Sequence, residues 1–121
     1  MRNPYQQYKQ NSVLTAPAGE LTLMLYNGAL KFCTQAEEAI EKQDPKLSHI
    51  YLIKVQDIIS ELTITLDNKY PIAAEMKRLY DYINELLIEA NMKKDVQKLR
   101  EAKGLIKEFR DTWQEVIKAK K

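Results

Sequence analysis

Histidine, cysteine and clustered carboxylates are the residues of this 121-residue chain that could carry out chemistry. A di-iron site inside a helical bundle requires two Glu-x-x-His motifs that project inward. The chain has a single histidine, His49, and Lys46 occupies the position three residues before it, so neither motif exists. His49 is therefore expected at the surface or at the edge of the core, without a metal.

The single cysteine and the acidic residues have simpler explanations than catalysis. Cys33 falls on the apolar side of a helical pattern and is expected to be a small buried side chain rather than a nucleophile. Glu37, Glu38 and Glu41 are interpreted as a solvated helix face. The sequence has neither a phosphate-binding glycine loop nor a nucleophile-elbow motif. We therefore expect no catalytic residue, no metal and no cofactor.

Composition indicates one helical domain. The chain is 45% hydrophobic and 30% charged, with three Gly and four Pro, which disfavours collagen-like, linker-like and turn-rich all-β proteins. A lone cysteine leaves no internal disulfide and is consistent with a reducing compartment. The longest apolar runs, residues 23–26 and 50–53, are too short to span a bilayer, and residues 1–5 lack a signal peptide's apolar region. A cytoplasmic location is expected.

Four segments have the spacing of amphipathic helices, at about residues 17–43, 45–66, 72–90 and 95–117. Asp44 and Pro45 are expected to cap and begin the second helix, and Asn91 to end the third. Short connections make successive helices antiparallel neighbours. The predicted fold is all-α, an antiparallel up-down four-helix bundle over residues 15–121, preceded by an N-terminal arm or short extra helix at residues 1–14.

Helical periodicity also assigns a core face to each helix. Gly28 lies on the first of these faces, where it is expected to permit close helix approach. The residues assigned to the core are Leu21, Leu25, Ala29, Phe32, Cys33, Ala36, Ala39 and Ile40; Leu47, Ile50, Tyr51, Val55, Ile58, Ile59 and Leu62; Ile72, Met76, Leu79, Tyr80, Ile83, Leu86, Leu87 and Ala90; and Leu99, Ala102, Leu105, Ile106, Phe109, Trp113, Val116 and Ile117.

Charge is divided unevenly along a chain whose formal net charge is only +2. Residues 92–121 hold ten basic and five acidic side chains, against nine and twelve in residues 1–91. A basic last helix could contact nucleic acid. The acidic residues that alternate with the basic ones, such as Glu101 before Lys103 and Glu115 before Lys118, fit a salt-bridged exposed face better. Nucleic acid is accordingly the weaker alternative, and no nucleic-acid partner is expected.

Some apolar side chains exceed what the four core faces require. Leu23 and Leu30 fall opposite the main stripe of the first helix, with Tyr26 at its margin. Ile53 and Ile64 lie off the core face of the second helix, and Tyr82 and Ile88 flank that of the third. Single exposed aliphatics are normal, but several on a small protein favour grooves for an amphipathic helix. The candidate binding residues are Leu23, Tyr26, Leu30, Ile53, Ile64 and Tyr82.

Blocks along nearly the whole chain resemble, in order, the FliS family of flagellar secretion chaperones. They include residues 3–5 (NPY), 24–30 (MLYNGAL), 54–59 (KVQDII), 79–83 (LYDYI) and 110–113 (RDTW). The resemblance implies a cytosolic, non-enzymatic helical bundle without stable membrane insertion. Such a protein binds the C-terminal region of flagellin, prevents premature polymerisation, and delivers flagellin to the flagellar type III export apparatus.

The resemblance also suggests roles for particular residues. The six candidate binding residues become the flagellin contacts, and the arm, with Tyr5, Tyr8 and Val13, is expected to cover part of the groove or contact the membrane component of the export gate. A weak homodimer is left open. The alternative function is a generic helical-bundle adaptor or regulator for another amphipathic-helix client.

Overall fold

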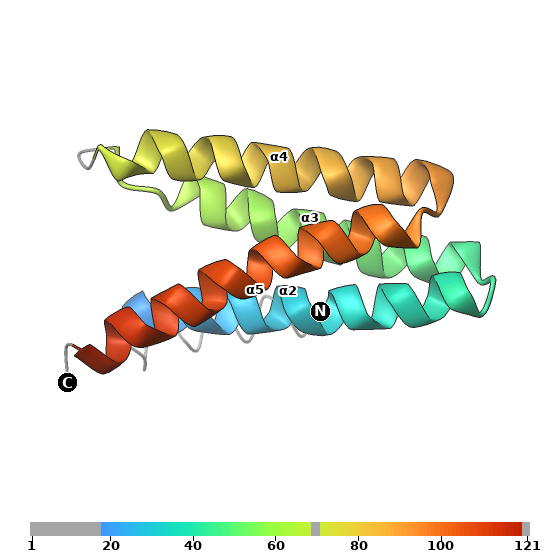
Figure 1. Cartoon of the computed structure of the whole chain (residues 1–121), viewed down its shortest axis with the longest axis horizontal. Helices are drawn as coiled ribbons and strands as arrows, with labels where there is room; N and C mark the ends of the chain where they lie inside the picture. The colour runs from blue at the N-terminus through green and yellow to red at the C-terminus, as the bar shows by residue number, and fades with distance from the viewer. Residues whose placement is uncertain (1–17, 69–70, 120–121) are drawn as a thin grey trace, which may run out of the picture.

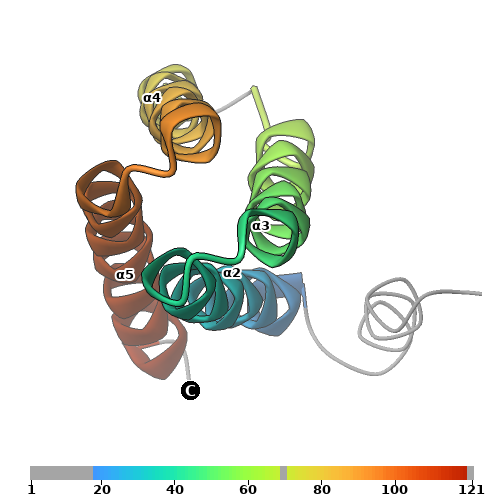
Figure 2. The same cartoon turned by 90° about the vertical axis from the view of Figure 1, so that its right-hand side faces the viewer.

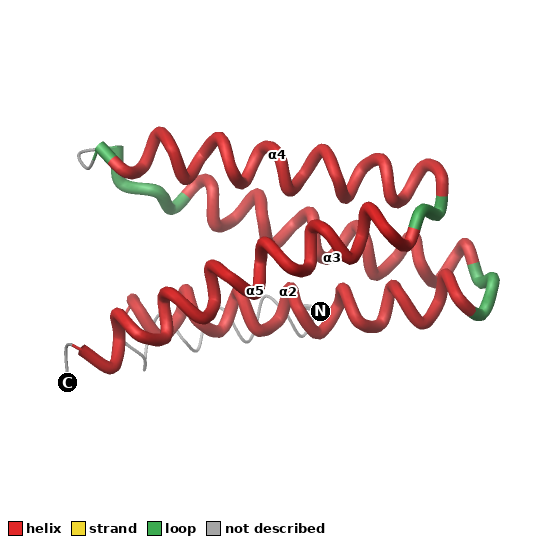
Figure 3. The backbone as a smooth tube through the Cα atoms, viewed as in Figure 1, coloured by secondary structure: helices red, strands yellow, loops and turns green. Residues whose placement is uncertain are grey.

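A computed structural model describes residues 18–68 and 71–119 as four α-helices without a strand. The helices are α2 (Ala18–Glu41), α3 (Pro45–Ile64), α4 (Ile72–Lys93) and α5 (Val96–Ala119). Short loops join α2 to α3 and α4 to α5 (Figure 3). The all-α four-helix bundle predicted from the sequence is confirmed, whereas residues 1–14, the predicted arm, lie outside the described residues.

The helices form a closed ring in chain order. Each helix packs against the next one, and α5 returns to pack against α2 (Figure 2). Successive helices run in opposite directions (Figure 1). Helices α2 and α4 therefore stand on opposite sides of the ring, as do α3 and α5. None of the described helices is long and apolar enough to cross a membrane.

Local sequence signals explain the turn between α2 and α3. Gln43 takes a left-handed conformation, with φ of 59°, and the Asp44 N–H donates to the Ala39 carbonyl at 2.8 Å. The Asp44 side chain then accepts from the Leu47 N–H at 3.1 Å, and Pro45 occupies the first turn of α3. The predicted cap at Asp44 and Pro45 is confirmed.

The predicted end of α4 at Asn91 is wrong. The helix continues to Lys93 and ends at Lys94, whose left-handed backbone (φ 51°) lets its N–H reach the Ala90 carbonyl. Asn91 instead uses its side chain, with Nδ2 2.8 Å from Nδ1 of His49 and Oδ1 accepting from the Lys94 ammonium. Asp95 then begins α5 by accepting from the backbone N–H of Gln97 and Lys98.

Most of the predicted core is buried, but α3 is rotated from the expected orientation. Ser48 and Leu52 are fully buried, whereas Leu47 and Ile50 are exposed. Because α3 carries aliphatic side chains on several sides, periodicity alone could not choose between neighbouring faces. Other residues assigned to the core are also exposed in the structure; these are Ile72, Leu79 and Val116.

Side-chain volume changes along the bundle. At the end that holds the α2–α3 and α4–α5 turns, small buried side chains allow close helix approach; they are Ala36, Ala39, Ser48, Ala90 and Ala102. Toward the other end the interior holds the rings of Tyr26, Tyr80 and Phe109. Helices α4 and α5 accordingly lie close at the first end and separate toward the second (Figure 1).

Candidate functional site

The side chains considered for metal binding and catalysis, His49 and Cys33, have contacts within the fold that account for them. His49 is exposed and faces the Asn91 amide. Cys33 is fully buried, and burial raises the pKa of its thiol to about 12, so it stays protonated near neutral pH. Within residues 18–68 and 71–119, no group of three or more His, Cys, Asp or Glu side chains could hold a metal ion.

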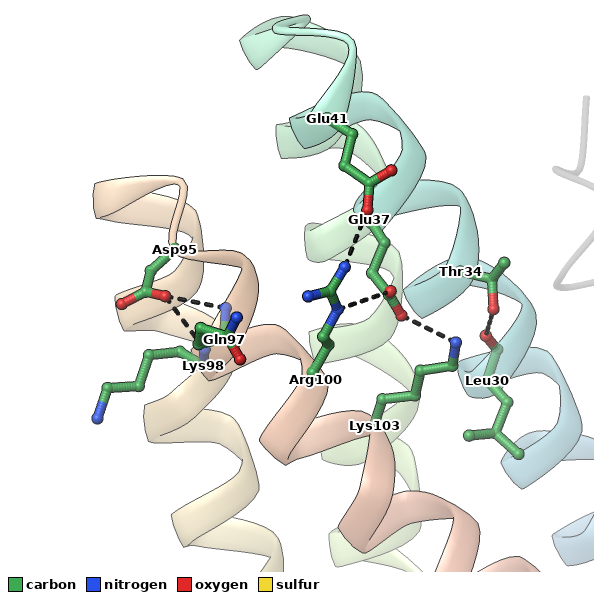
Figure 4. Close-up of polar contacts among 9 residues, drawn as sticks. All are labelled: Leu30, Thr34, Glu37, Glu41, Asp95, Gln97, Lys98, Arg100 and Lys103. Carbon is green, nitrogen blue, oxygen red and sulfur yellow. Dashed lines mark hydrogen bonds and ion pairs between the residues drawn. The ribbon is translucent and has the colours of Figure 1, made fainter.

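Two of the carboxylates expected on a solvated face connect α2 to α5. Glu37 accepts from Lys103 Nζ at 2.8 Å and from Arg100 Nε at 3.3 Å, and Glu41 accepts from Arg100 Nη2 at 3.0 Å (Figure 4). The Glu37 side chain is only 15% exposed. Lys103 therefore pairs across helices rather than with Glu101 of its own helix, which corrects the expected pairing. The basic character of α5 is partly offset by α2.

Tyr26 is a core residue and not a surface contact. It is 1% exposed, its hydroxyl lies 2.5 Å from that of Tyr80, and its ring stacks on Phe109 with the centroids 6.0 Å apart. Burial raises the pKa of both phenols. The wide end of the bundle accommodates a large ring, and the hydroxyl of Tyr80 satisfies that of Tyr26 across the interior. The expectation that Tyr26 lies at an exposed margin is corrected.

Leu23 and Leu30 lie along the contact between α2 and α5, and we call this pair the α2–α5 seam. Both are half-buried, and Leu30 packs against the core. Asn27, one turn from each of them, accepts from Arg110 Nη1 at 3.0 Å, which places this row of α2 beside α5. Figure 4 shows Leu30 on the side of α2 that carries Glu37. The expectation that the two leucines point away from the helix contacts is therefore wrong.

Ile53 and Ile64 remain exposed, at 37% and 77%. They share a row of α3 with His49, whose contact with Asn91 places this row beside α4. Ile88, which is 42% exposed, lies one turn before Asn91 on α4. We call Ile53, Ile64 and Ile88 the α3–α4 seam; it presents aliphatic side chains from both helices.

Tyr82 is on the other side of α4. It is 45% exposed, and its hydroxyl donates to Glu101 Oε2 of α5 at 2.5 Å. The six candidate residues therefore do not form one site. They divide between the α2–α5 seam, the α3–α4 seam, the contact of α4 with α5, and the core.

Five exposed apolar residues were missed as surface candidates because the sequence pattern assigned them to the core. They are Leu47, Ile50, Ile72, Leu79 and Val116, and the most exposed of them are Ile72, at 59%, and Ile50, at 49%. Met92, at 77%, was not assigned to any face. Only the orientation of each helix distinguishes such residues from core ones. Tyr5, Tyr8 and Val13, the candidate residues of the arm, lie outside the described residues.

The sequence of this chain is similar to those of known proteins. The family model described as flagellar protein FliS matches residues 1–120. The flagellar secretion chaperone FliS of Bacillus subtilis (strain 168) is 46% identical over 121 residues, covering 100% of this chain and 91% of that protein. The flagellar secretion chaperone FliS of Campylobacter jejuni (strain 81116) is 30% identical over 114 residues, with coverage of 93% and 89%. That of Salmonella typhimurium (strain LT2) is 29% identical over 110 residues, with coverage of 88% and 82%.

Proposed function

Because this chain belongs to the FliS family of flagellar secretion chaperones, we propose that it binds the C-terminal region of flagellin. In this proposal it holds that region in the cytoplasm, prevents its premature polymerisation, and delivers flagellin to the flagellar type III export apparatus. The family supports the role of export chaperone. The exposed aliphatic side chains of the α3–α4 seam support the choice of an amphipathic helix as the bound element.

The observation that carries the proposal is the α3–α4 seam. Ile53, Ile64 and Ile88 are exposed aliphatics contributed by two neighbouring helices. An amphipathic helix laid between α3 and α4 can cover them with side chains three and four residues apart. Full burial of each aliphatic side chain contributes roughly 1.5 to 3 kcal/mol, so a few are enough to offset the ordering of a flexible client.

The α2–α5 seam provides a second contact with different geometry. It faces the opposite side of the ring from the α3–α4 seam (Figure 2). A single straight helix cannot touch both seams at once. If Leu23 and Leu30 also contact flagellin, the client must contain at least two helical stretches joined by a segment that passes around the bundle.

The arm has a separate part in the proposal. By resemblance to the family, residues 1–14 cover part of the client groove, and Tyr5, Tyr8 and Val13 contact the membrane component of the export gate. A tyrosine ring suits such a contact because it combines apolar area with a hydroxyl group at low entropic cost.

Calorimetric titration of the full chain with a peptide from the C-terminal region of flagellin tests the proposal. One-to-one binding with micromolar or tighter affinity is expected. Ile53→Lys and Ile64→Lys should each weaken binding about tenfold, because a buried aliphatic contact is replaced by a desolvated charge. Helical circular dichroism should not change, since both side chains are exposed.

Thr112→Lys is the matched control. Thr112 is exposed on α5, away from the α3–α4 seam, and the substitution introduces the same charge. The Thr112→Lys variant should bind the flagellin peptide with the same affinity as the unaltered chain. Absence of binding at tens of micromolar contradicts the choice of client. Normal binding by both isoleucine variants contradicts the choice of the α3–α4 seam while leaving the client intact.

A further inference from the structure

A partly exposed apolar face lies where α4 meets α5, and we call it the α4–α5 seam; it comprises Leu79, Tyr82 and Leu105. Leu79 and Tyr82 are 40% and 45% exposed and are one turn apart on α4. Leu105 of α5 is half-buried and packs against the core. It follows Glu101, the hydrogen-bond partner of Tyr82, by one turn. The seam thus presents apolar side chains from two neighbouring helices.

Three carboxylates lie near the phenol of Tyr82, and the exposed cation Arg78 lies one turn before it on α4. The hydrogen bond to Glu101 raises the pKa of Tyr82, and desolvation and the charges of Glu101, Glu85 and Glu89 raise it further. Glu89 has one exposed counterion, Lys98, at 3.7 Å. Among the described residues, neither Glu85 nor Glu101 forms an ion pair with a lysine or arginine.

The opposite edge of α5 differs. There Arg100 and Lys103 point to Glu37 and Glu41 of α2, so cations and carboxylates neutralise each other within the chain (Figure 4). At the α4–α5 seam Glu89 pairs with Lys98, whereas Glu85 and Glu101 have no ion pair among the described residues. An occupant that supplies positive charge to these two carboxylates is therefore favoured.

Gly104 provides an observation independent of charge. It is exposed in the middle of α5, one turn from Glu101, and a Cβ placed on it would meet no atom within 4 Å. A glycine inside a helix costs about 1 kcal/mol relative to alanine. No contact within the described chain explains this cost. A glycine on a helix surface does allow another backbone to approach closely.

We propose that the α4–α5 seam is the docking site of a basic amphipathic helix from a partner protein. Its apolar side covers Leu79 and Leu105, and its arginine or lysine side chains pair with Glu85 and Glu101 or lie over the ring of Tyr82. Its backbone passes over Gly104. This seam is distinct from the α3–α4 seam assigned to flagellin, and the inference does not rest on that assignment.

A pair of synthetic helical peptides of about 18 residues tests the inference. Both carry leucines on one face; one has arginines beside the leucines and the other has glutamates in the same places. Fluorescence anisotropy with the full chain at physiological salt should show binding of the arginine peptide and binding at least tenfold weaker for the glutamate peptide.

Variants of the chain test whether the arginine peptide binds at the α4–α5 seam. Combined Glu85→Gln and Glu101→Gln should weaken the arginine peptide about fivefold, as expected for two surface ion pairs. Gly104→Trp should block close approach without unfolding an exposed helix position. The control combines Glu38→Gln with Asp57→Gln, which removes two exposed carboxylates on α2 and α3 and should leave binding unchanged.

Several results overturn the inference. Equal affinity for the two peptides excludes charge recognition, and an equal loss in the control variant excludes this location. Displacement of the arginine peptide by the flagellin peptide shows that the site is not separate. If Gly104→Trp instead abolishes a dimer of the chain in the absence of peptide, a second copy is the occupant.

Discussion

The hydroxyl groups of Tyr26 and Tyr80 join helices on opposite sides of the ring. They lie 2.5 Å apart in the interior, and Phe109 of α5 packs against both rings, with centroid distances of 6.0 and 5.1 Å. This cluster therefore connects three helices at the wide end of the bundle. Neither hydroxyl has free access to water, so each depends on the other for hydrogen bonding.

The pair makes stability sensitive to alkaline pH. The pKa of each phenol is raised above its ordinary value of 10.0 by burial. A raised folded pKa means that unfolding releases protons above pH 10, so the stabilisation is fully present below that pH and is lost as pH rises further. The free energy of unfolding, measured by guanidinium titration, should fall above about pH 10.

Combined Tyr26→Phe and Tyr80→Phe should reduce this alkaline loss, because no buried phenol remains to titrate. Tyr80→Phe alone should cost about 1 to 3 kcal/mol at neutral pH, since the hydroxyl of Tyr26 loses its partner. The pKa of the Cys33 thiol is also raised. Adding Cys33→Ala to the double phenylalanine variant therefore removes the contribution of the thiol to the alkaline loss of stability. An unchanged alkaline loss in the double phenylalanine variant contradicts this account.

The burial of single residues was predicted correctly from the sequence for Cys33 but not for Tyr26. The burial of Cys33 followed from its small apolar neighbours on one helical face. Tyr26 was misplaced because a tyrosine at the margin of a stripe is compatible with either side. Its burial depends on Tyr80 and Phe109, which are 54 and 83 residues away in the chain, and no local pattern contains that information.

At the scale of the helices, Glu37 links α2 to α5. Its side chain is 15% exposed and contacts both Lys103 and Arg100. Glu37→Ala should lower the free energy of unfolding by about 1 kcal/mol, at the upper end for exposed pairs because the carboxylate is largely covered. The deficit should shrink in high salt. Glu38→Ala, at an exposed neighbouring position, should change stability by less than about 0.5 kcal/mol.

In contrast to Glu37→Ala, replacement of Gly104 should raise the free energy of unfolding. Its Cβ position is open, so Gly104→Ala should stabilise the chain by about 0.5 to 1 kcal/mol, as read from thermal unfolding. Destabilisation by Gly104→Ala would show that α5 is held in a different environment.

The sequence pattern predicted that Gly28 permits close helix approach. A Cβ there would lie 3.5 Å from Ile58 Cδ1, an ordinary contact, so close packing does not require this glycine.

Helix positions were more predictable than helix orientations. The four segments and the Asp44 and Pro45 cap follow from periodicity and capping chemistry. The rotation of α3 does not, because Leu52 and Ile53 are adjacent aliphatics and only packing against α2 and α4 decides which is buried. The end of α4 was missed because it depends on Lys94, a residue with no propensity for the left-handed conformation that it adopts.

For the whole molecule, the family could be identified from motifs spread over the chain, but the candidate binding residues could not be grouped. Leu23 and Leu30, Ile53 and Ile64, and Tyr82 lie at three different helix contacts of the ring. A one-dimensional pattern shows which side chains exceed the core, whereas their grouping requires the neighbours of each helix. In the folded chain these side chains lie at several edges of the bundle rather than at one.

An exposed aliphatic seam also predicts self-association. Two copies of the free chain can cover Ile53 and Ile64 with each other, but this area is small, so a weak dimer is expected at high concentration only. Sedimentation velocity should show concentration-dependent association that Ile64→Lys removes and Thr112→Lys does not. Association that survives Ile64→Lys contradicts the use of this seam between copies.

The measurement that tests the central claim most directly is filament assembly of purified flagellin, followed by light scattering with and without the chain. At equimolar ratio the unaltered chain and its Thr112→Lys variant should suppress assembly, whereas combined Ile53→Lys and Ile64→Lys should not. If assembly proceeds normally in the presence of the unaltered chain, the proposed holding of flagellin is contradicted. If the double isoleucine variant suppresses assembly equally well, the α3–α4 seam is not the surface that does so.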